Sequence, residues 1–255
     1  MMNMAAQSAS SASMMKRSVC KHGVWFTVLT LLATSSHAQQ ATLDIQLLDN
    51  GTSIGEWHPA IINTGTNYIL NDVTYNPLGA SIRCYNMTIG YDPFISASVD
   101  VVNTLTTLQN YTLIFTLPIS PITGGSLMGG STQGGLTDAN NDGVGTLSTI
   151  GAGTALYYGR IDGANVLPLF PASTAVSVPF AGGSTNISAS AGLPGPTIGG
   201  PSVTTSIGIE HDFSLTPGDR ATFTSFFVVQ PVPEPACLSL LAIGGGILLF
   251  RRNRR

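Results

Sequence analysis

A two-residue alternation of apolar and polar side chains runs through the middle of the chain and limits the folds open to it. The alternation is clearest in residues 43–47, 95–101, 111–119 and 203–209. Successive side chains of a β-strand point to opposite faces of a sheet, so this pattern predicts strands that bury one face. Shorter apolar segments bounded by Gly, Pro, Asn or Asp predict further strands at residues 85–89, 154–161, 176–180 and 222–229.

The same region lacks the features of helices. No window between residues 39 and 231 repeats apolar residues at helical spacing, and strong helix formers such as Lys and Glu are scarce there. The segment is long enough for one sizeable core and too short for two comfortable domains. We therefore expect an all-β fold over residues 39–231, a single β-sandwich of the jelly-roll or immunoglobulin-like kind.

Two glycine-rich stretches interrupt the predicted strands. Paired glycines recur every five residues in the segment 124–137, and the segment 181–201 is rich in Gly, Ser and Pro. Glycine reaches positive φ angles at little cost, which suits successive turns. The sequence therefore predicts a long surface loop in each stretch, with a linker or structural role favoured over a binding role.

The body of the chain is strongly acidic. Residues 39–231 hold twelve Asp and Glu residues against three arginines, a net charge of −9. The full chain has a net charge of only −3, because the other seven basic residues lie towards its two ends. A body of this charge has no patch for a phosphate backbone and no lysine for a P-loop, so nucleic-acid binding is not expected.

The N-terminal residues have the layout of a secretory signal peptide. A basic segment at 16–22 precedes an apolar segment at 24–33, and a small-x-small site ends at Ala38, directly before Gln39. This order predicts passage through the Sec translocon and cleavage by signal peptidase after Ala38, so residues 1–38 are expected to lie outside the fold. Two internal methionines are equally suitable starts for this leader: Met14 and Met15.

The C-terminal residues form three ordered elements. A Pro-Glu-Pro motif is followed by the unbroken apolar segment 236–250 and then by a cluster of arginines. At about 1.5 Å per residue, a helix of this segment reaches about 22 Å, less than the roughly 30 Å hydrocarbon core of a bilayer. Arginines after the segment keep this end on the cytoplasmic side. The motif and the arginine cluster consist of Val232, Pro233, Glu234, Pro235, Arg251, Arg252, Arg254 and Arg255.

This layout resembles the PEP-CTERM sorting signal of exosortase substrates, and the resemblance is confined to residues 232–255. It implies cleavage at or near the Pro-Glu-Pro motif by an exosortase, a membrane enzyme with its own catalytic cysteine. It also implies delivery of the body to the cell surface or extracellular matrix of a Gram-negative-type bacterium, after a transient stage as an inner-membrane precursor. An ordinary single-span anchor that holds the body at the inner membrane is the alternative.

The cysteines predict no disulfide in the exported body. Cys20 lies in the leader and Cys237 in the C-terminal segment, so Cys84 alone remains after removal of both. Its place in an alternating segment predicts a small buried hydrophobic residue rather than a reactive thiol.

One segment has the spacing of a calcium-binding loop. Between Asp138 and Gly143, oxygen-bearing side chains stand at the first, third and fifth positions, and glycine at the sixth allows a sharp turn. Thr149 stands where EF-hand loops have a bidentate glutamate, so binding is expected to be weak. A hairpin turn between two strands, which Asn-Asp-Gly suits equally well, is the alternative. The candidate ligands are the side chains of Asp138, Asn140 and Asp142 and the carbonyl of Val144.

Catalytic motifs are scarce. His58 and His211 each lie beside carboxylates, but neither belongs to a metalloprotease or hydrolase motif, and both are expected at surface or turn positions. The paired carboxylates of a glycan hydrolase leave no fixed spacing in a sequence. Trp57, Tyr157 and Tyr158 are candidates for stacking on sugar rings, although core packing is favoured for them.

These observations together predict an exported protein of the cell surface or extracellular matrix, processed by an exosortase. We expect a structural or adhesive role in association with extracellular polysaccharide, with no catalytic residue and no cofactor other than calcium. The first alternative is a carbohydrate-binding module, with or without assistance from calcium. The second is a surface glycan hydrolase.

Overall fold

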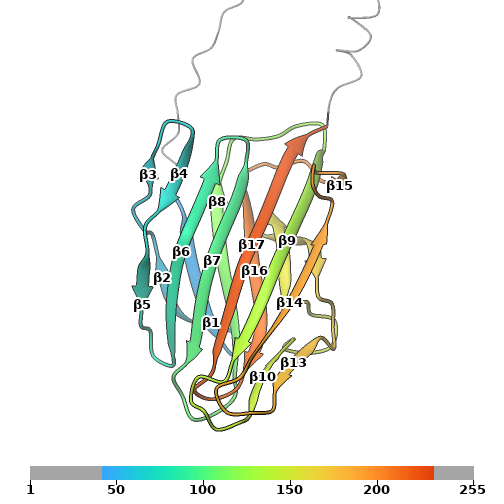
Figure 1. The fold of residues 1–255 in the computed structure, drawn as a ribbon. Coiled ribbons are helices and arrows are strands. Elements are labelled where there is room, and N and C mark those ends of the chain that lie inside the picture. Colours follow the sequence, from blue (N-terminus) through green and yellow to red (C-terminus); the bar gives the residue numbers. More distant parts are fainter. Residues whose placement is uncertain (1–41, 233–255) are drawn as a thin grey trace, which may run out of the picture. The chain divides into compact units, whose positions relative to one another are not determined.

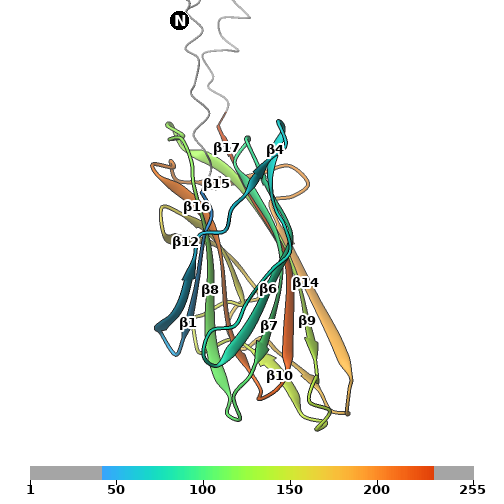
Figure 2. The ribbon, with the colours of Figure 1, turned by 90° about the vertical axis from the view of Figure 1, so that its left-hand side faces the viewer.

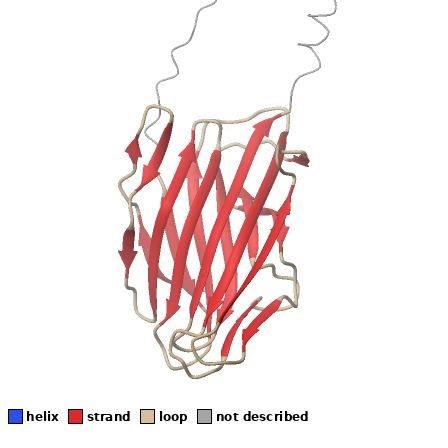
Figure 3. Ribbon diagram, viewed as in Figure 1, coloured by secondary structure: helices blue, strands red, loops and turns tan. Residues whose placement is uncertain are grey.

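The computed structural model describes residues 42–232, and these form strands without any helix (Figure 3). The predicted signal peptide with its Ala38–Gln39 cleavage site, the motif residues after Val232 and the arginine cluster lie outside the described residues. The strands are β1 (Asp44–Asp49), β2 (Thr52–Trp57), β3 (Ile62–Asn63), β4 (Asn67–Leu70), β5 (Val73–Tyr75), β6 (Ala80–Gly90), β7 (Phe94–Asn103), β8 (Gln109–Pro118), β9 (Ser126–Thr137), β10 (Gly145–Ser148), β11 (Tyr157–Ile161), β12 (Ala164–Leu169), β13 (Ala175–Val178), β14 (Ser184–Ala191), β15 (Ile198–Gly200), β16 (Ser206–Leu215) and β17 (Arg220–Pro231).

The strands form two antiparallel sheets, which we call sheet A and sheet B (Figure 1). Sheet A has eight strands, with the main order β12-β11-β16-β8-β1-β2, and β10 joins it beside β13 and β16. Sheet B has nine strands, with the main order β14-β9-β17-β7-β6-β4-β3, and it also carries β15 on β9 and β5 on β6.

The two sheets face each other across one hydrophobic core (Figure 2). The rings of Phe213 in β16 and Phe223 in β17 lie 5.0 Å apart between centroids. The Tyr157 hydroxyl in β11 donates a hydrogen bond of 2.8 Å to the Phe226 carbonyl in β17. Along β8 every second side chain is buried. The predicted all-β fold with half-buried strands is therefore confirmed, and all eight predicted strand segments overlap strands.

Strand pairing fixes which connections share an end of the sheets. The last residue of β9, Thr137, pairs with the first residue of β17, Arg220, and β9 and β17 run antiparallel along their full length. One end, the loop end, therefore carries the β9–β10, β13–β14 and β16–β17 connections, which span residues 138–144, 179–183 and 216–219. The other end, the tail end, carries the start of β1 and the end of β17 (Figure 1).

The prediction of a surface loop over residues 124–137 is wrong. Most of this segment is β9, which lies between β14 and β17 and is twelve residues long. Its glycines allow neighbours to approach on both sides. A Cβ at Gly129 would lie 2.4 Å from the Gly192 carbonyl oxygen, and one at Gly135 would lie 2.5 Å from the Thr222 hydroxyl. Glycine here serves close packing rather than turns, except at Gly124 and Gly125, where φ is positive.

The second predicted loop, residues 181–201, is also mostly strand. It contains β14, the edge strand of sheet B, and the short strand β15. Exposure alternates along β14, and Ile187 and Ala189 pack against the core from its inner face. The alternation is weak in the sequence because Ser on the outer face alternates with Ala on the inner face, and these two small residues differ little in size.

Candidate functional site

Asp138 begins the β9–β10 connection at the loop end and is only 1% exposed. Its Oδ2 atom accepts hydrogen bonds from the backbone N–H groups of Gly143 (2.8 Å) and Gly182 (3.2 Å). Its own N–H donates to the Gly183 carbonyl (3.0 Å). One buried carboxylate therefore ties the β9–β10 connection to the β13–β14 connection.

The rest of the predicted calcium loop is wound into successive turns. The Asp142 N–H donates to Asn140 Oδ1 (2.9 Å), and the Val144 N–H donates to Asp142 Oδ1 (2.8 Å). Asn141 and Gly143 have positive φ angles of 62° and 81°. Side chains that accept from the backbone two residues ahead curl the chain tightly, and calcium loops need this curvature to bring oxygen atoms together.

The alternative of a hairpin turn is wrong for this segment. The segment connects β9 in sheet B to β10 in sheet A, and β10 pairs with β13 and β16 rather than with β9. A hairpin joins two adjacent paired strands, whereas this connection crosses from one sheet to the other. The Asn-Asp-Gly sequence therefore does not form the turn of a hairpin between two paired strands.

A further acidic residue, Asp219, joins the loop from the β16–β17 connection. Its Oδ1 accepts a hydrogen bond from the Ala139 N–H (3.3 Å), and it is fully buried. The Asn140 amide donates to the Pro217 carbonyl (2.8 Å) and to Asp142 Oδ2 (2.9 Å). Sequence reasoning missed Asp219 because it lies 80 residues from Ala139, and its only local signal is a Pro-Gly-Asp turn.

Asp219 is affected by the charges of the other two acids of the loop end, Asp138 and Asp142. Burial raises the pKa of Asp219, hydrogen bonds from Thr216 and Ala139 lower it, and the negative charges of Asp138 and Asp142 raise it further, so the pKa lies above its usual value. None of the ion pairs within residues 42–232 involves any of these three acids. Asp138 Oδ1 is buried and has no hydrogen-bond partner among the described residues.

The three carboxylates do not form a compact metal cluster by themselves. In the part of the chain that the structure describes, no group of three His, Cys, Asp or Glu side chains is arranged to hold a metal ion. A cation at the loop end would therefore need neutral oxygen ligands as well, from the Asn140 amide and from backbone carbonyls such as that of Val144.

A second group of charges lies on the outer face of sheet A. Arg160 Nη1 is 2.9 Å from Glu210 Oε2, and the Asn165 amide donates to Glu210 Oε1 (2.8 Å). Burial raises the pKa of Asp212 to about 6, opposed by a hydrogen bond from Thr112 and assisted by the charge of Glu210 and a hydrogen bond with it. Glu210 is thus occupied by Arg160 and Asn165, whereas Asp212 Oδ1 is buried without a hydrogen-bond partner among the described residues.

His211 lies in the core, which corrects the expectation of a surface or turn position. It is completely buried, its ring stacks on Phe223 with centroids 4.3 Å apart, and its Nε2 is 3.1 Å from the Ser225 hydroxyl. Burial lowers its pKa to about 3. A neutral histidine enclosed between two sheets has no route to a substrate, so its role is packing.

The other residues named in the sequence analysis are explained by packing, by local hydrogen bonds or by a surface position. Cys84 is fully buried and burial raises its pKa to about 12, which confirms the buried-hydrophobe prediction. Trp57 packs against the core and stacks on Tyr75, with centroids 4.5 Å apart. Tyr157 is buried, and the Tyr158 hydroxyl accepts from the Ala155 N–H (2.7 Å). His58 is exposed and lies 2.7 Å from Asp44, as expected for a surface histidine.

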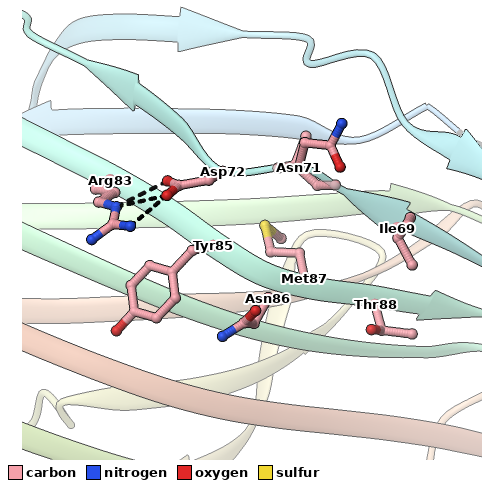
Figure 4. A pocket seen from close by; sticks show the side chains of 9 residues that line it. Ile69, Asn71, Asp72, Arg83, Tyr85, Asn86, Met87 and Thr88 are labelled. Carbon is pink, nitrogen blue, oxygen red and sulfur yellow. Dashed lines mark hydrogen bonds and ion pairs between the residues drawn. The ribbon is translucent and has the colours of Figure 1, made fainter.

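A hollow of about 450 Å³ opens at the edge of sheet B, where β4 ends and β5 begins (Figure 4). Opposite this break, β6 contains a bulge between Tyr85 and Thr88, with Asn86 at a positive φ of 51°. Arg83 forms a bidentate ion pair with Asp72, and its guanidinium carbon lies 5.1 Å from the centre of the Tyr85 ring. The hollow thus combines an aromatic ring with planar polar side chains.

Val232 is the one sorting-motif residue that the structure describes, and it is 41% exposed after the end of β17. No helix long and apolar enough to cross a membrane is present within residues 42–232. No protein-family model matches the chain, and a search of curated proteins finds no match to it.

Proposed function

We propose that this protein is exported, processed by an exosortase and retained at the cell surface or in the extracellular matrix, where it has a structural or adhesive role with polysaccharide. The sorting motif in the sequence is the basis of this proposal. The observation that supports it best is the position of Val232, which is exposed directly after the last strand. Cleavage at Pro233–Pro235 would leave β17 and its pairing with β7 and β9 complete.

The proposed processing at the other end is equally compatible with the fold. The first strand begins at Asp44, and Leu43 is the first described residue that is buried in the core. Cleavage after Ala38 by signal peptidase would remove no strand. We further propose a sandwich of the jelly-roll or immunoglobulin-like kind, because the chain crosses between the two sheets at β7–β8, β8–β9 and β16–β17.

The decisive experiment is the intact mass of the protein recovered from the surface or matrix fraction. We expect a chain that begins near Gln39 and lacks the residues after about Pro235. Replacing all four arginines of the cluster by Gln should leave an uncleaved precursor in the inner membrane. Recovery of the wild-type chain only in the inner membrane, with its C-terminus still at Arg255, would overturn the sorting proposal and favour the single-span anchor.

The second candidate function is carbohydrate binding at the hollow beside β6. Sugar rings stack on aromatic faces, and Asn, Asp and Arg side chains supply the paired donors and acceptors that hydroxyl groups need. Tyr85, Asn86 and the Arg83–Asp72 pair provide this combination in one hollow. Titration with exopolysaccharide oligosaccharides should show binding that Tyr85→Ala weakens at least tenfold. Tyr91→Ala, at an exposed tyrosine that does not line the hollow, is the control.

A further inference from the structure

We propose that the loop from Asp138 to Val144, together with Asp219, forms a calcium site that joins three connections at the loop end. This inference concerns the exported body and does not depend on how the chain is sorted. It also adds a ligand, Asp219, that the spacing of a calcium loop does not include.

The first argument is the unused capacity of Asp138. A carboxylate that is 1% exposed normally has both oxygen atoms hydrogen-bonded, because a buried polar atom without a partner has lost its hydrogen bonds to water and gained none in return. Here Oδ2 accepts two backbone N–H groups, whereas Oδ1 has no partner among the described residues. Among the three acids of the loop end, Oδ1 of Asp138 is the one carboxylate oxygen without a donor among the described residues, because both oxygens of Asp142 and of Asp219 accept hydrogen bonds. This oxygen is therefore the one most in need of a cation.

The second argument is charge. The residues directly after Asp138 link it to the other two acids. The Ala139 N–H donates to Asp219 Oδ1 (3.3 Å), and the Asn140 amide donates to Asp142 Oδ2 (2.9 Å). Sheet B brings Asp219 there through the pairing of Arg220 with Thr137. None of the three acids has an ion pair to a described Arg or His, so a cation bound among them would be attracted by all three charges.

The third argument concerns the identity of the ion. The available ligands are carboxylate, amide and backbone carbonyl oxygens on an irregular loop, with no His or Cys nearby in the sequence of either segment. Zn²⁺ prefers nitrogen and sulfur ligands, and Mg²⁺ requires near-octahedral geometry, whereas Ca²⁺ accepts six to eight oxygens in flexible arrangements. The position of the usual bidentate glutamate is held by Thr149, whose N–H donates to the Thr174 carbonyl (3.1 Å) beyond β10. A dissociation constant on the order of 10⁻⁴ to 10⁻³ M, as in extracellular modules, follows.

Calcium at this position would stabilise the whole loop end. Asp138 already contacts the β13–β14 connection through Gly182, and Asn140 contacts the β16–β17 connection through Pro217. An ion shared by the β9–β10 and β16–β17 connections would fix all three segments relative to one another. Two of these connections carry exposed apolar side chains, Val144 (62% exposed) and Phe180 (60% exposed). A bound ion would hold both side chains in fixed positions on the surface.

The test is thermal unfolding of the full chain, purified in detergent, in chelator and in 10 mM calcium chloride. Ten millimolar is roughly 10 to 100 times the expected dissociation constant, so the melting temperature should rise by about 3 to 10 °C. Asp142→Asn and Asp219→Asn should each abolish most of this rise. Both substitutions keep a side-chain oxygen that can accept the backbone N–H group.

Two controls separate calcium binding from general effects. Magnesium chloride and sodium chloride at equal ionic strength screen the repulsion between the carboxylates but are not expected to occupy the site. They should therefore raise the melting temperature much less than calcium chloride does. Asp162→Asn, at the tail end, should lower the melting temperature and leave the calcium-induced rise unchanged. The inference is overturned if wild type does not respond to calcium, if sodium chloride reproduces the response, or if the loop variants respond as wild type does.

Discussion

Asp162 and Asp138 both anchor loops by accepting backbone hydrogen bonds, yet they differ in what they leave unused. Asp162 follows β11 at the tail end and accepts from the N–H groups of Thr204 (2.8 Å), Thr205 (2.7 Å) and Ser206 (3.0 Å), with the Thr205 hydroxyl as a fourth donor. Burial acts to raise its pKa, but these hydrogen bonds outweigh it and hold the pKa well below its usual value. Both of its oxygen atoms are in use.

Asp138, at the loop end, has donors on only one oxygen and two acids as neighbours. The contrast shows that loop anchoring alone accounts for Asp162 but not for Asp138. All four donors to Asp162 are used for loop anchoring, and they occupy both of its oxygen atoms. The unpartnered Oδ1 of Asp138, together with the absence of an ion pair to any of the three acids among the described residues, is what points to a cation.

The largest expected effect is that of Asp138→Ala. This change leaves the N–H groups of Gly143 and Gly182 without their acceptor, each at a cost of about 1–3 kcal/mol if it is not rehydrated. We expect the free energy of unfolding to fall by about 2–5 kcal/mol in urea titrations. A loss below about 0.5 kcal/mol would show that the carboxylate does not hold the two connections together.

Asp162→Ala should have a smaller effect, about 0.5–2 kcal/mol, because Thr204 and Thr205 are exposed and water can replace the lost acceptor. The effect should depend on pH. The pKa of Asp162 is lower in the folded protein than its ordinary value of 3.8, so the ionised carboxylate stabilises the fold. This stabilisation is complete above pH 3.8 and is lost as the pH falls through the folded pKa. Wild type and variant should therefore converge in acid. Equal separation of their urea midpoints at pH 7 and pH 2 would contradict this.

Asp219→Asn should have the smallest effect in chelator, and with the opposite sign. The pKa of Asp219 is raised, so the folded state favours the protonated form and its contribution to stability declines as the pH rises above 3.8. Removing the charge should raise the free energy of unfolding at pH 7 by a few tenths of a kcal/mol to about 1 kcal/mol. In 10 mM calcium the variant should instead be less stable than wild type. A variant that is less stable under both conditions would indicate a purely structural role.

Much of the fold can be predicted from the sequence, because buried positions of a strand carry apolar side chains and exposed positions carry polar ones. β8 has large apolar residues on one face and polar ones on the other, so its prediction needed no tertiary information. β9 was missed because its inner positions include glycine, whose place is set by neighbours such as Tyr157 and Phe223 that come much later in the chain. Local pattern cannot report close packing between distant segments.

The candidate site divides in the same way. Asp138, Asn140 and Asp142 were predicted from spacing, since they belong to one loop, and their turns form as the spacing requires. Asp219 reaches the loop only through the pairing of β9 with β17, and the hollow beside β6 exists only because β4 and β5 are interrupted opposite a bulge. Both depend on sheet register, which the sequence does not state.

The central claim is that the loop end holds one calcium ion where the tail end holds none. Isothermal titration of the full chain with calcium chloride measures this directly. We predict one site per chain with a dissociation constant between about 10⁻⁴ and 10⁻³ M, absent in Asp142→Asn and unchanged in Asp162→Asn. No binding heat in wild type up to 10 mM calcium, or equal binding by wild type and Asp142→Asn, would contradict the claim.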